Sequence, residues 1–143
     1  MSERAAGGTS ERAGGAPAPR AIVAGHGDFA AGIVSAVQQI TGRGDAFVTI
    51  SARDLGAADL EALVRRTVEE TGARVVFTDL QAGSCTMAAR KVLRGRDDAV
   101  LVVGANLPML VDFVFADKLS PADAARHALE RGKAAMLLIG GRP

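Results

Sequence analysis

Four short apolar runs alternate along this chain with longer segments of helical periodicity, and this alternation restricts the fold. The runs, each about the length of a β-strand, cover residues 21–25, 46–50, 74–78 and 98–103. Runs that are apolar throughout are typical of parallel strands covered on both faces. Between them apolar residues recur at helical spacing, as in the stripe Ala30, Ile33, Val34 and Val37. The pattern predicts a doubly wound α/β sheet with right-handed crossovers.

Glycine and capping residues indicate where the helices begin and end. Gly42, Gly72 and Gly95 each follow a periodic segment, at the position of a left-handed C-cap. Ser120 and Pro121 are typical of a helix start, and that helix is expected to run to about residue 131. The last apolar run, 134–139, is predicted to be a strand.

A sheet of order 2-1-3-4 has its topological crossover between the first and third strands, where ligands of open α/β sheets bind. The loops that meet there contain Gly25-His26-Gly27 and the segment 79–84. Neighbouring parallel strands lie about 4.8 Å apart, so His26 and Asp79 are expected to be within contact distance. The other histidine, His127, falls in a helical pattern and is expected on a solvated face.

His26, Asp79 and Ser84 together suggest that the histidine acts as a nucleophile toward an anionic group. A carboxylate on one ring nitrogen fixes the tautomer of a histidine and leaves the other nitrogen as a nucleophile. Ser84 follows Asp79 at the start of a predicted helix, whose N–H groups attract anions. A histidine that accepts and releases a phosphoryl group needs these three features: a nucleophilic nitrogen, a carboxylate that orients the ring, and groups that bind an anion. The alternatives are a hydrogen-bonded turn for His26, helix caps for Asp79 and Ser84, and a Ser-His-Asp hydrolase, although the usual Gly-x-Ser-x-Gly elbow is absent.

Composition narrows the classes of protein that fit. The chain has 143 residues, enough for one domain, and 48% of them are hydrophobic. Only 3% are aromatic and the net charge is +1, which argues against a nucleic-acid partner. The single cysteine, Cys85, excludes an internal disulfide and fits a reducing compartment; it is expected to be buried, and no metal or cofactor is expected.

The first 20 residues differ in composition from the rest of the chain. They are rich in small residues and proline, and contain no apolar stretch typical of a signal peptide. We expect residues 1–20 to form a disordered tail and residues 21–143 to form the domain. No run is long enough for a membrane span, so a cytoplasmic location is predicted.

Three segments resemble the IIA components of the mannose class of the bacterial sugar phosphotransferase system. They are Ala-Ile-Val-Ala-Gly-His-Gly at 21–27, the stretch 78–90 that contains Asp79 and Ser84, and Val-Gly-Ala-Asn-Leu-Pro-Met-Leu at 103–110. The third is the most specific, and the likeness extends over about residues 21–140. The resemblance implies that His26 is the phosphoryl acceptor, that Asp79 orients it, and that Ser84 contacts the phosphoryl oxygens.

The same resemblance implies partners and an assembly. The histidine phosphocarrier protein would donate the phosphoryl group and a separate IIB component would receive it, with a membrane permease of IIC and IID subunits involved only indirectly. The candidate docking residues are Phe29, Leu80 and Leu107. The family fold implies a homodimer that exchanges its final antiparallel strand, here residues 134–139.

The phosphate loop departs from the family pattern. Ala82 replaces a glycine, Cys85 a proline and Met87 an asparagine, which changes the backbone freedom of this loop. These changes favour an alternative function, in which phosphorylation of His26 controls binding to another protein and not sugar transport.

Overall fold

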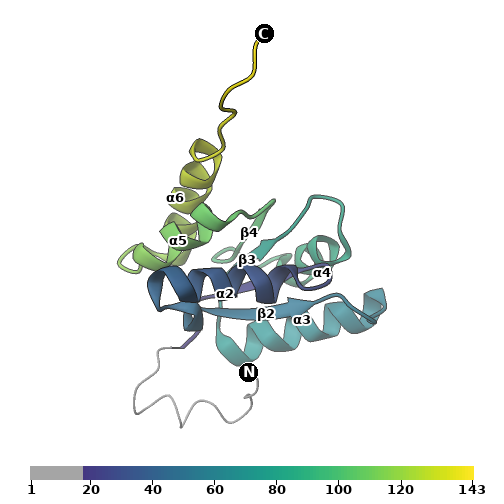
Figure 1. The fold of residues 1–143 in the computed structure, drawn as a ribbon. Helices are drawn as coiled ribbons and strands as arrows, with labels where there is room; N and C mark the ends of the chain where they lie inside the picture. The colour runs from purple at the N-terminus through teal and green to yellow at the C-terminus, as the bar shows by residue number, and fades with distance from the viewer. Residues whose placement is uncertain (1–17) are drawn as a thin grey trace.

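The computed structural model describes residues 18–143, which fold around a four-stranded sheet (Figure 1). The strands are β1 (Ala21–Gly25), β2 (Phe47–Ser51), β3 (Val75–Thr78) and β4 (Val100–Val103). Their order is β2-β1-β3-β4, and each neighbouring pair is parallel. The predicted strand order is therefore confirmed, and each of the four strands predicted for the sheet is found within two residues of its expected bounds.

In the described range, residues 18–143, five α-helices and one short 3-10 helix connect the strands or follow them. They are α2 (Phe29–Thr41), η1 (Gly44–Ala46), α3 (Ala57–Thr71), α4 (Ser84–Leu93), α5 (Leu107–Phe115) and α6 (Pro121–Ala134). Gly42 and Gly72 end α2 and α3 with φ angles of 74° and 72°, as their positions predicted. The Ser120 side chain caps α6 by accepting a hydrogen bond from the backbone N–H of Asp123.

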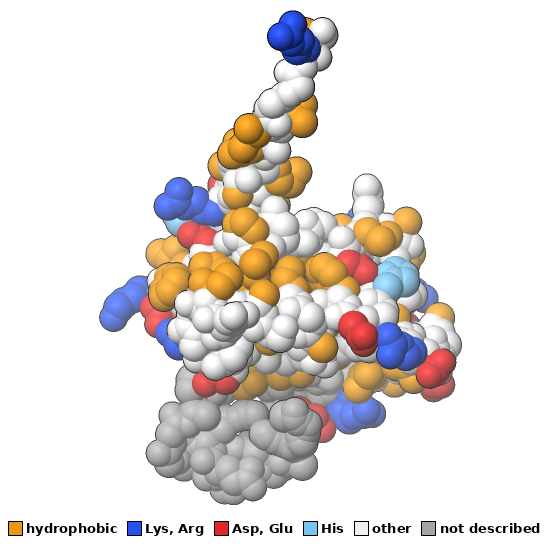
Figure 2. Space-filling model, viewed as in Figure 1, with side chains coloured by type: hydrophobic (Ala, Val, Ile, Leu, Met, Phe, Trp, Pro, Cys, Tyr) orange, Lys and Arg blue, Asp and Glu red, His pale blue; other side chains and the backbone are white. Residues whose placement is uncertain are grey.

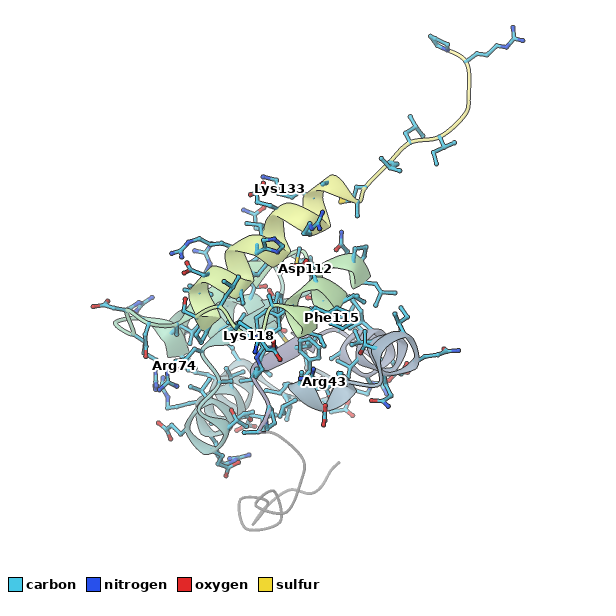
Figure 3. The ribbon with its side chains drawn as sticks, turned by 90° about the vertical axis from the view of Figure 1, so that its left-hand side faces the viewer. Arg43, Arg74, Asp112, Phe115, Lys118 and Lys133 are labelled. Atoms are coloured by element: carbon cyan, nitrogen blue, oxygen red, sulfur yellow. The ribbon has the colours of Figure 1, made fainter. Side chains whose placement is uncertain are left out.

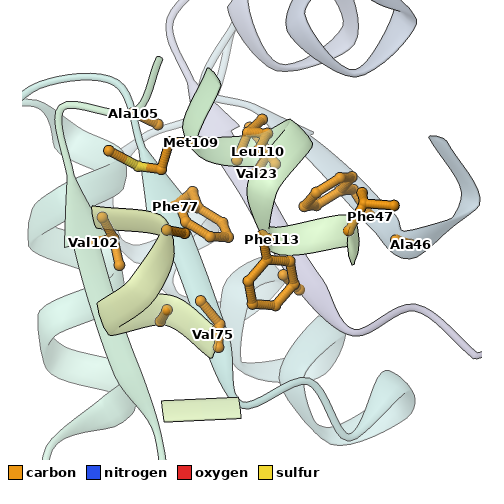
Figure 4. Close-up of a cluster of buried hydrophobic side chains, with 14 of the residues drawn as sticks. Val23, Ala46, Phe47, Val75, Phe77, Val102, Ala105, Met109, Leu110 and Phe113 are labelled. Atoms are coloured by element: carbon orange, nitrogen blue, oxygen red, sulfur yellow. The ribbon is translucent and has the colours of Figure 1, made fainter. Parts of the chain in front are cut away.

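The helices cover both faces of the sheet, and alternate residues of each strand pack into two cores. Val23 of β1 lies in the core that includes α2, α5 and α6, whereas Ile22 lies in the core that includes α3 and α4. Phe77 and Phe113 meet edge to face in the first core, with ring centroids 5.2 Å apart (Figure 4). Burial on both faces explains why the two central strands, β1 and β3, are almost entirely apolar.

The C-terminal part differs from the prediction. Helix α6 continues to Ala134, and residues 134–139 form no strand within this chain. Met136, Leu137, Leu138 and Ile139 are 70%, 77%, 96% and 85% exposed. Figure 3 shows this segment leaving α6 and projecting away from the domain. A strand needs a neighbour to hydrogen-bond with, and none of the four described strands pairs with this segment.

Residues 18–20, which the sequence assigned to the tail, pack against the domain. Pro19 is buried, and the Arg20 guanidinium lies 4.4 Å from the centroid of the Phe113 ring and donates a hydrogen bond to its carbonyl. The rest of the expected tail, residues 1–17, lies outside the described residues. Within the range 18–143, no helix has both the length and the apolar character that crossing a bilayer requires.

Candidate functional site: a histidine–aspartate pair at the sheet crossover

His26 and Asp79 meet at the carboxyl end of the sheet, as predicted. His26 follows the last residue of β1, and Asp79 follows the last residue of β3, its neighbour in the sheet. The His26 Nδ1 atom lies 2.7 Å from Asp79 Oδ2, and the backbone N–H of His26 donates to the same oxygen at 2.8 Å. The histidine side chain is 56% exposed and that of Asp79 only 8%. The imidazole is thus accessible to a partner while its carboxylate is shielded.

The charge state of Asp79 fixes the histidine tautomer. Desolvation acts to raise the pKa of Asp79, but hydrogen bonds from the backbone and ring of His26, the charge of His26 and the N–H of Leu80 outweigh it, so that the pKa lies below its ordinary value. An ionised carboxylate only accepts hydrogen bonds, so in the neutral form of the imidazole the ring proton is placed on Nδ1. The lone pair of Nε2 is therefore available for reaction.

Two glycines leave the space in which the Asp79 carboxylate and the His26 ring lie. A Cβ atom on Gly25 would lie 2.9 Å from the Asp79 carboxyl carbon and 2.7 Å from the Phe29 ring. A Cβ atom on Gly83 would lie 2.9 Å from Cε1 of His26. Real Cβ atoms essentially never come this close, so the imidazole can lie directly over the backbone of the β3–α4 loop only because Gly83 has no side chain.

The β3–α4 loop brings the start of a helix to the histidine. Gly83, at which any Cβ atom would meet the imidazole, is the N-cap of α4, and α4 has no side-chain capping hydrogen bond at this end. Ser84 is exposed as the first residue of α4. The loop is held by Thr86, whose hydroxyl lies 2.7 Å from Thr78 Oγ1 and 2.6 Å from the Leu80 carbonyl oxygen. The N–H groups at the start of a helix favour an anion placed near them.

The remaining predictions for this region have mixed outcomes. Neither Asp79 nor Ser84 is the N-cap of α4, which excludes the alternative that they serve only as helix caps. Cys85 is fully buried as expected, and burial, followed by the charge of Asp79, raises its thiol pKa to about 11. His127 is exposed on α6 but is not free: its Nδ1 lies 2.7 Å from Asp112 Oδ2 on α5. Among residues 18–143, no cluster of three or more potential metal ligands occurs.

Sequence reasoning missed two charged residues beside the histidine. Arg53, in the β2–α3 loop, donates a hydrogen bond from Nη2 to Asp28 Oδ1 at 3.1 Å. A Cβ atom on Gly27, the residue after His26, would lie 3.4 Å from the same Arg53 nitrogen. The signal was available, because Arg53 follows the end of β2 and β2 is the other neighbour of β1.

The fold and site together define a class: a doubly wound α/β protein with an exposed, carboxylate-bound histidine at the crossover of its sheet. The sequence model of the family described as PTS system fructose IIA component matches residues 20–130. The chain therefore belongs to this family of phosphotransferase system IIA components, the mannose-class family that its motifs resemble. No match is found among curated proteins.

Solved structures agree with this assignment. A Klebsiella pneumoniae protein described as a candidate permease of the phosphoenolpyruvate-dependent sugar phosphotransferase system is 26% identical, with a TM-score of 0.73 over 85% of this chain and 90% of that one. The mannose/sorbose-specific IIA subunit from Enterococcus faecalis is 22% identical, with a TM-score of 0.74 over 89% and 98%. A sigma-54 interaction domain protein from Enterococcus faecalis is 11% identical, with a TM-score of 0.63 over 82% and 92%. The last two show a shared fold.

Proposed function

We propose that this protein is a phosphocarrier that accepts a phosphoryl group on Nε2 of His26. The observation that carries the proposal is the 2.7 Å contact between His26 Nδ1 and Asp79, which leaves Nε2 unprotonated on an exposed ring. Nε2 attacks the phosphorus, a P–N bond forms, and the P–N bond to the donor histidine breaks. The donor nitrogen recovers its electron pair, and Asp79 balances the positive charge that develops on the phosphorylated imidazole.

Ser84 and the start of α4 supply the second part of the mechanism. In-line phosphoryl transfer requires little covalent chemistry from a protein beyond the nucleophile, and depends on positioning and on charge stabilisation. We assign the Ser84 hydroxyl and the N–H groups of the first turn of α4 to the phosphoryl oxygens. Gly83 supports this assignment, because its backbone lies against the imidazole and precedes those groups directly.

The proposed partners are the histidine phosphocarrier protein as donor and a separate IIB component as acceptor, both met in the cytoplasm, with the membrane permease reached only through IIB. Leu80, in the loop after Asp79, is 47% exposed, and Met87 on α4 is 51% exposed. Of the other candidate docking residues, Phe29 and Leu107 are partly buried against the core, so Leu80 offers the largest apolar contact of the three.

The test is phosphorylation by phosphoenolpyruvate, the first enzyme of the system and the histidine phosphocarrier protein. We expect acid-labile label on the wild-type protein and none on a His26→Ala variant. His127→Ala is a matched control, because His127 is also exposed and also bonded to an aspartate at 2.7 Å, yet lies on α6. The proposal is wrong if His26→Ala labels like the wild type, or if labelling depends on His127 instead.

We further propose that the protein is a homodimer in which the C-terminal segment, residues 135–143, pairs with the sheet of the second copy. Four consecutive apolar side chains of this segment are at least 70% exposed, and β4 is an edge strand of the sheet. Ile40 and Phe115 are also 58% and 65% exposed. Figure 2 shows hydrophobic side chains in a band across the domain that continues up this segment.

A regulatory role is the second candidate function. It is favoured by Ala82, Cys85 and Met87, which depart from the family pattern in the loop proposed to hold the phosphoryl group. In that case the phosphoryl group on His26 changes the affinity of this protein for another protein and is not transferred further. Adding a mannose-class IIB component to the labelled protein separates the two: loss of label to IIB supports the carrier, and retention supports the regulator.

A further inference from the structure

Arg53 places a guanidinium group beside the loop that contains the proposed phosphoryl acceptor. Its Nη2 atom lies 3.4 Å from the position that a Cβ atom of Gly27, the residue that follows His26, would take, and it donates to the Asp28 carboxylate at 3.1 Å. The side chains of Arg53 and Asp28 are 56% and 86% exposed, so their ion pair is weak and easily exchanged for another. An arginine in this position can reach an anion on the histidine.

The β2–α3 loop is built to hold this arginine in place. The Ser51 hydroxyl donates to the Gly27 carbonyl at 3.0 Å and accepts from the backbone N–H of Arg53 at 3.1 Å. The N–H of Ala52 donates to the carbonyl of Gly25 at 3.0 Å. Asp54, the next residue, has a φ angle of 63° and is the only non-glycine residue with positive φ in the part of the chain that the structure describes. Backbone strain of this kind persists where the surrounding structure enforces it, often at functional sites.

We propose that Arg53 binds the phosphoryl group once it is on His26, exchanging its hydrogen bond to Asp28 for one to a phosphoryl oxygen. This inference rests on the proposed phosphorylation of His26. A guanidinium group binds phosphate through charge-assisted hydrogen bonds, and a phosphoryl group carries more negative charge than the carboxylate with which it competes. Arg53 and Asp28 then act in opposite directions: the arginine stabilises the phosphorylated state, and the aspartate disfavours it by competing for the arginine and by repulsion.

Because Arg53 and Asp28 are expected to have opposite effects on the stability of phosphorylated His26, variants of the two residues test the proposal. The equilibrium constant for phosphoryl transfer from the histidine phosphocarrier protein is measured for the wild type, Arg53→Gln and Asp28→Asn. We expect Arg53→Gln to lower this constant by about threefold to tenfold and Asp28→Asn to raise it, with both effects reduced at high salt. Both variants lose the same ion pair, so a purely structural role would shift the constant in the same direction in both. Arg94→Gln is the matched control, because Arg94 is exposed and lies at the end of α4 remote from Ser84.

The outcomes separate the two proposals. Wild-type protein that takes no label overturns the phosphocarrier function, and the role of Arg53 with it. Wild-type protein that labels, together with Arg53→Gln that behaves as Arg94→Gln does, overturns only the role of Arg53. The same conclusion follows if Arg53→Gln and Asp28→Asn shift the constant in the same direction. Arg53→Lys, which keeps the charge but not the planar fork, is expected to fall between the wild type and Arg53→Gln.

Discussion

At the scale of single residues, the site depends on the absence of side chains as much as on their presence. Gly25 and Gly83 leave the space in which the Asp79 carboxylate and the His26 ring lie. Asp79 in turn accepts hydrogen bonds from the backbone and the ring of His26, so one buried carboxylate fixes both the loop and the tautomer. Substitutions here should therefore affect phosphorylation more than folding.

Replacement of Gly83 by alanine tests this idea. The new methyl group would meet His26 Cε1 at 2.9 Å and displace the ring, so we expect labelling of His26 to fall at least tenfold while the domain remains folded. Gly56→Ala is the matched control, because Gly56 is the N-cap of α3, has almost the same backbone angles, and has nothing within 4 Å of its Cβ position. Equal labelling of the two variants would contradict the proposed packing of the imidazole over Gly83.

Asp79 should also link stability to pH. Its folded pKa is lowered, so its contribution is present at pH values above the ordinary carboxyl range and is lost as the pH falls through the folded value. We expect Asp79→Asn to lower the free energy of unfolding by about 1–3 kcal/mol at pH 7, and the difference from wild type to shrink as acid protonates the carboxyl group in the folded state. Denaturant titrations at pH 7 and in acid measure it. Asp98→Asn, at an exposed ion pair with Arg74, should change little.

At the scale of secondary-structure elements, α5 and α6 form a tightly joined pair over one face of the sheet. Asn106 caps α5 by accepting from the N–H of Met109, and donates from its Nδ2 to the carbonyl of Gly132 in α6. The Asp112–His127 contact joins the same two helices, with Asp112 lying toward α6 in Figure 3. His127 is thus part of a helix–helix contact, and it differs from His26 in lying on α6 and not at the end of a strand.

The helix pair predicts the effect of a substitution at Gly132. A Cβ atom there would lie 2.9 Å from both Asn106 Oδ1 and Met109 Cβ, so Gly132→Ala should separate α5 from α6 and destabilise the domain by about 1–3 kcal/mol. Gly32→Ala, inside α2 with nothing near its Cβ position, should instead stabilise by about 0.5–1 kcal/mol. Thermal melts of the two variants compare them directly; a neutral Gly132→Ala would show that the helices do not pack this closely.

At the scale of the whole molecule, the domain has a complete core on each face of its sheet but leaves one apolar segment uncovered. The segment 136–139 is more exposed than any other apolar stretch of its length among residues 18–143. The proposed exchange between two copies accounts for this exposure, because it would bury the segment and give β4 a second strand neighbour.

Removal of the C-terminal segment tests the proposed homodimer. We expect the full chain to sediment as a dimer at micromolar concentration and a chain ending at Ala135 to sediment as a monomer. Removal of Gly141, Arg142 and Pro143 alone is the control, since it leaves the apolar residues intact. A full-length monomer, or a dimer that survives the longer truncation, would show that this segment does not hold two copies together.

The sequence by itself determined the strands, their order and the meeting of His26 with Asp79. These depend on local apolar patterning and on a general rule of parallel sheets, that strand ends converge at the crossover. It also predicted the C-cap glycines Gly42 and Gly72 and the Ser120 cap of α6, whose signals lie within a few residues. The C-cap of α4 is Arg94, one residue before the predicted Gly95.

Only the tertiary structure decided the rest. Arg53 lies beside the histidine loop because β2 pairs with β1. The spacing of residues along the sequence does not show which residue of a neighbouring loop a side chain contacts. The same reason applies to His127, whose partner is on another helix. For residues 134–139, apolar character indicated burial but not the neighbour that provides it. A strand is defined by hydrogen bonds to another strand, and among residues 18–143 no strand pairs with this segment.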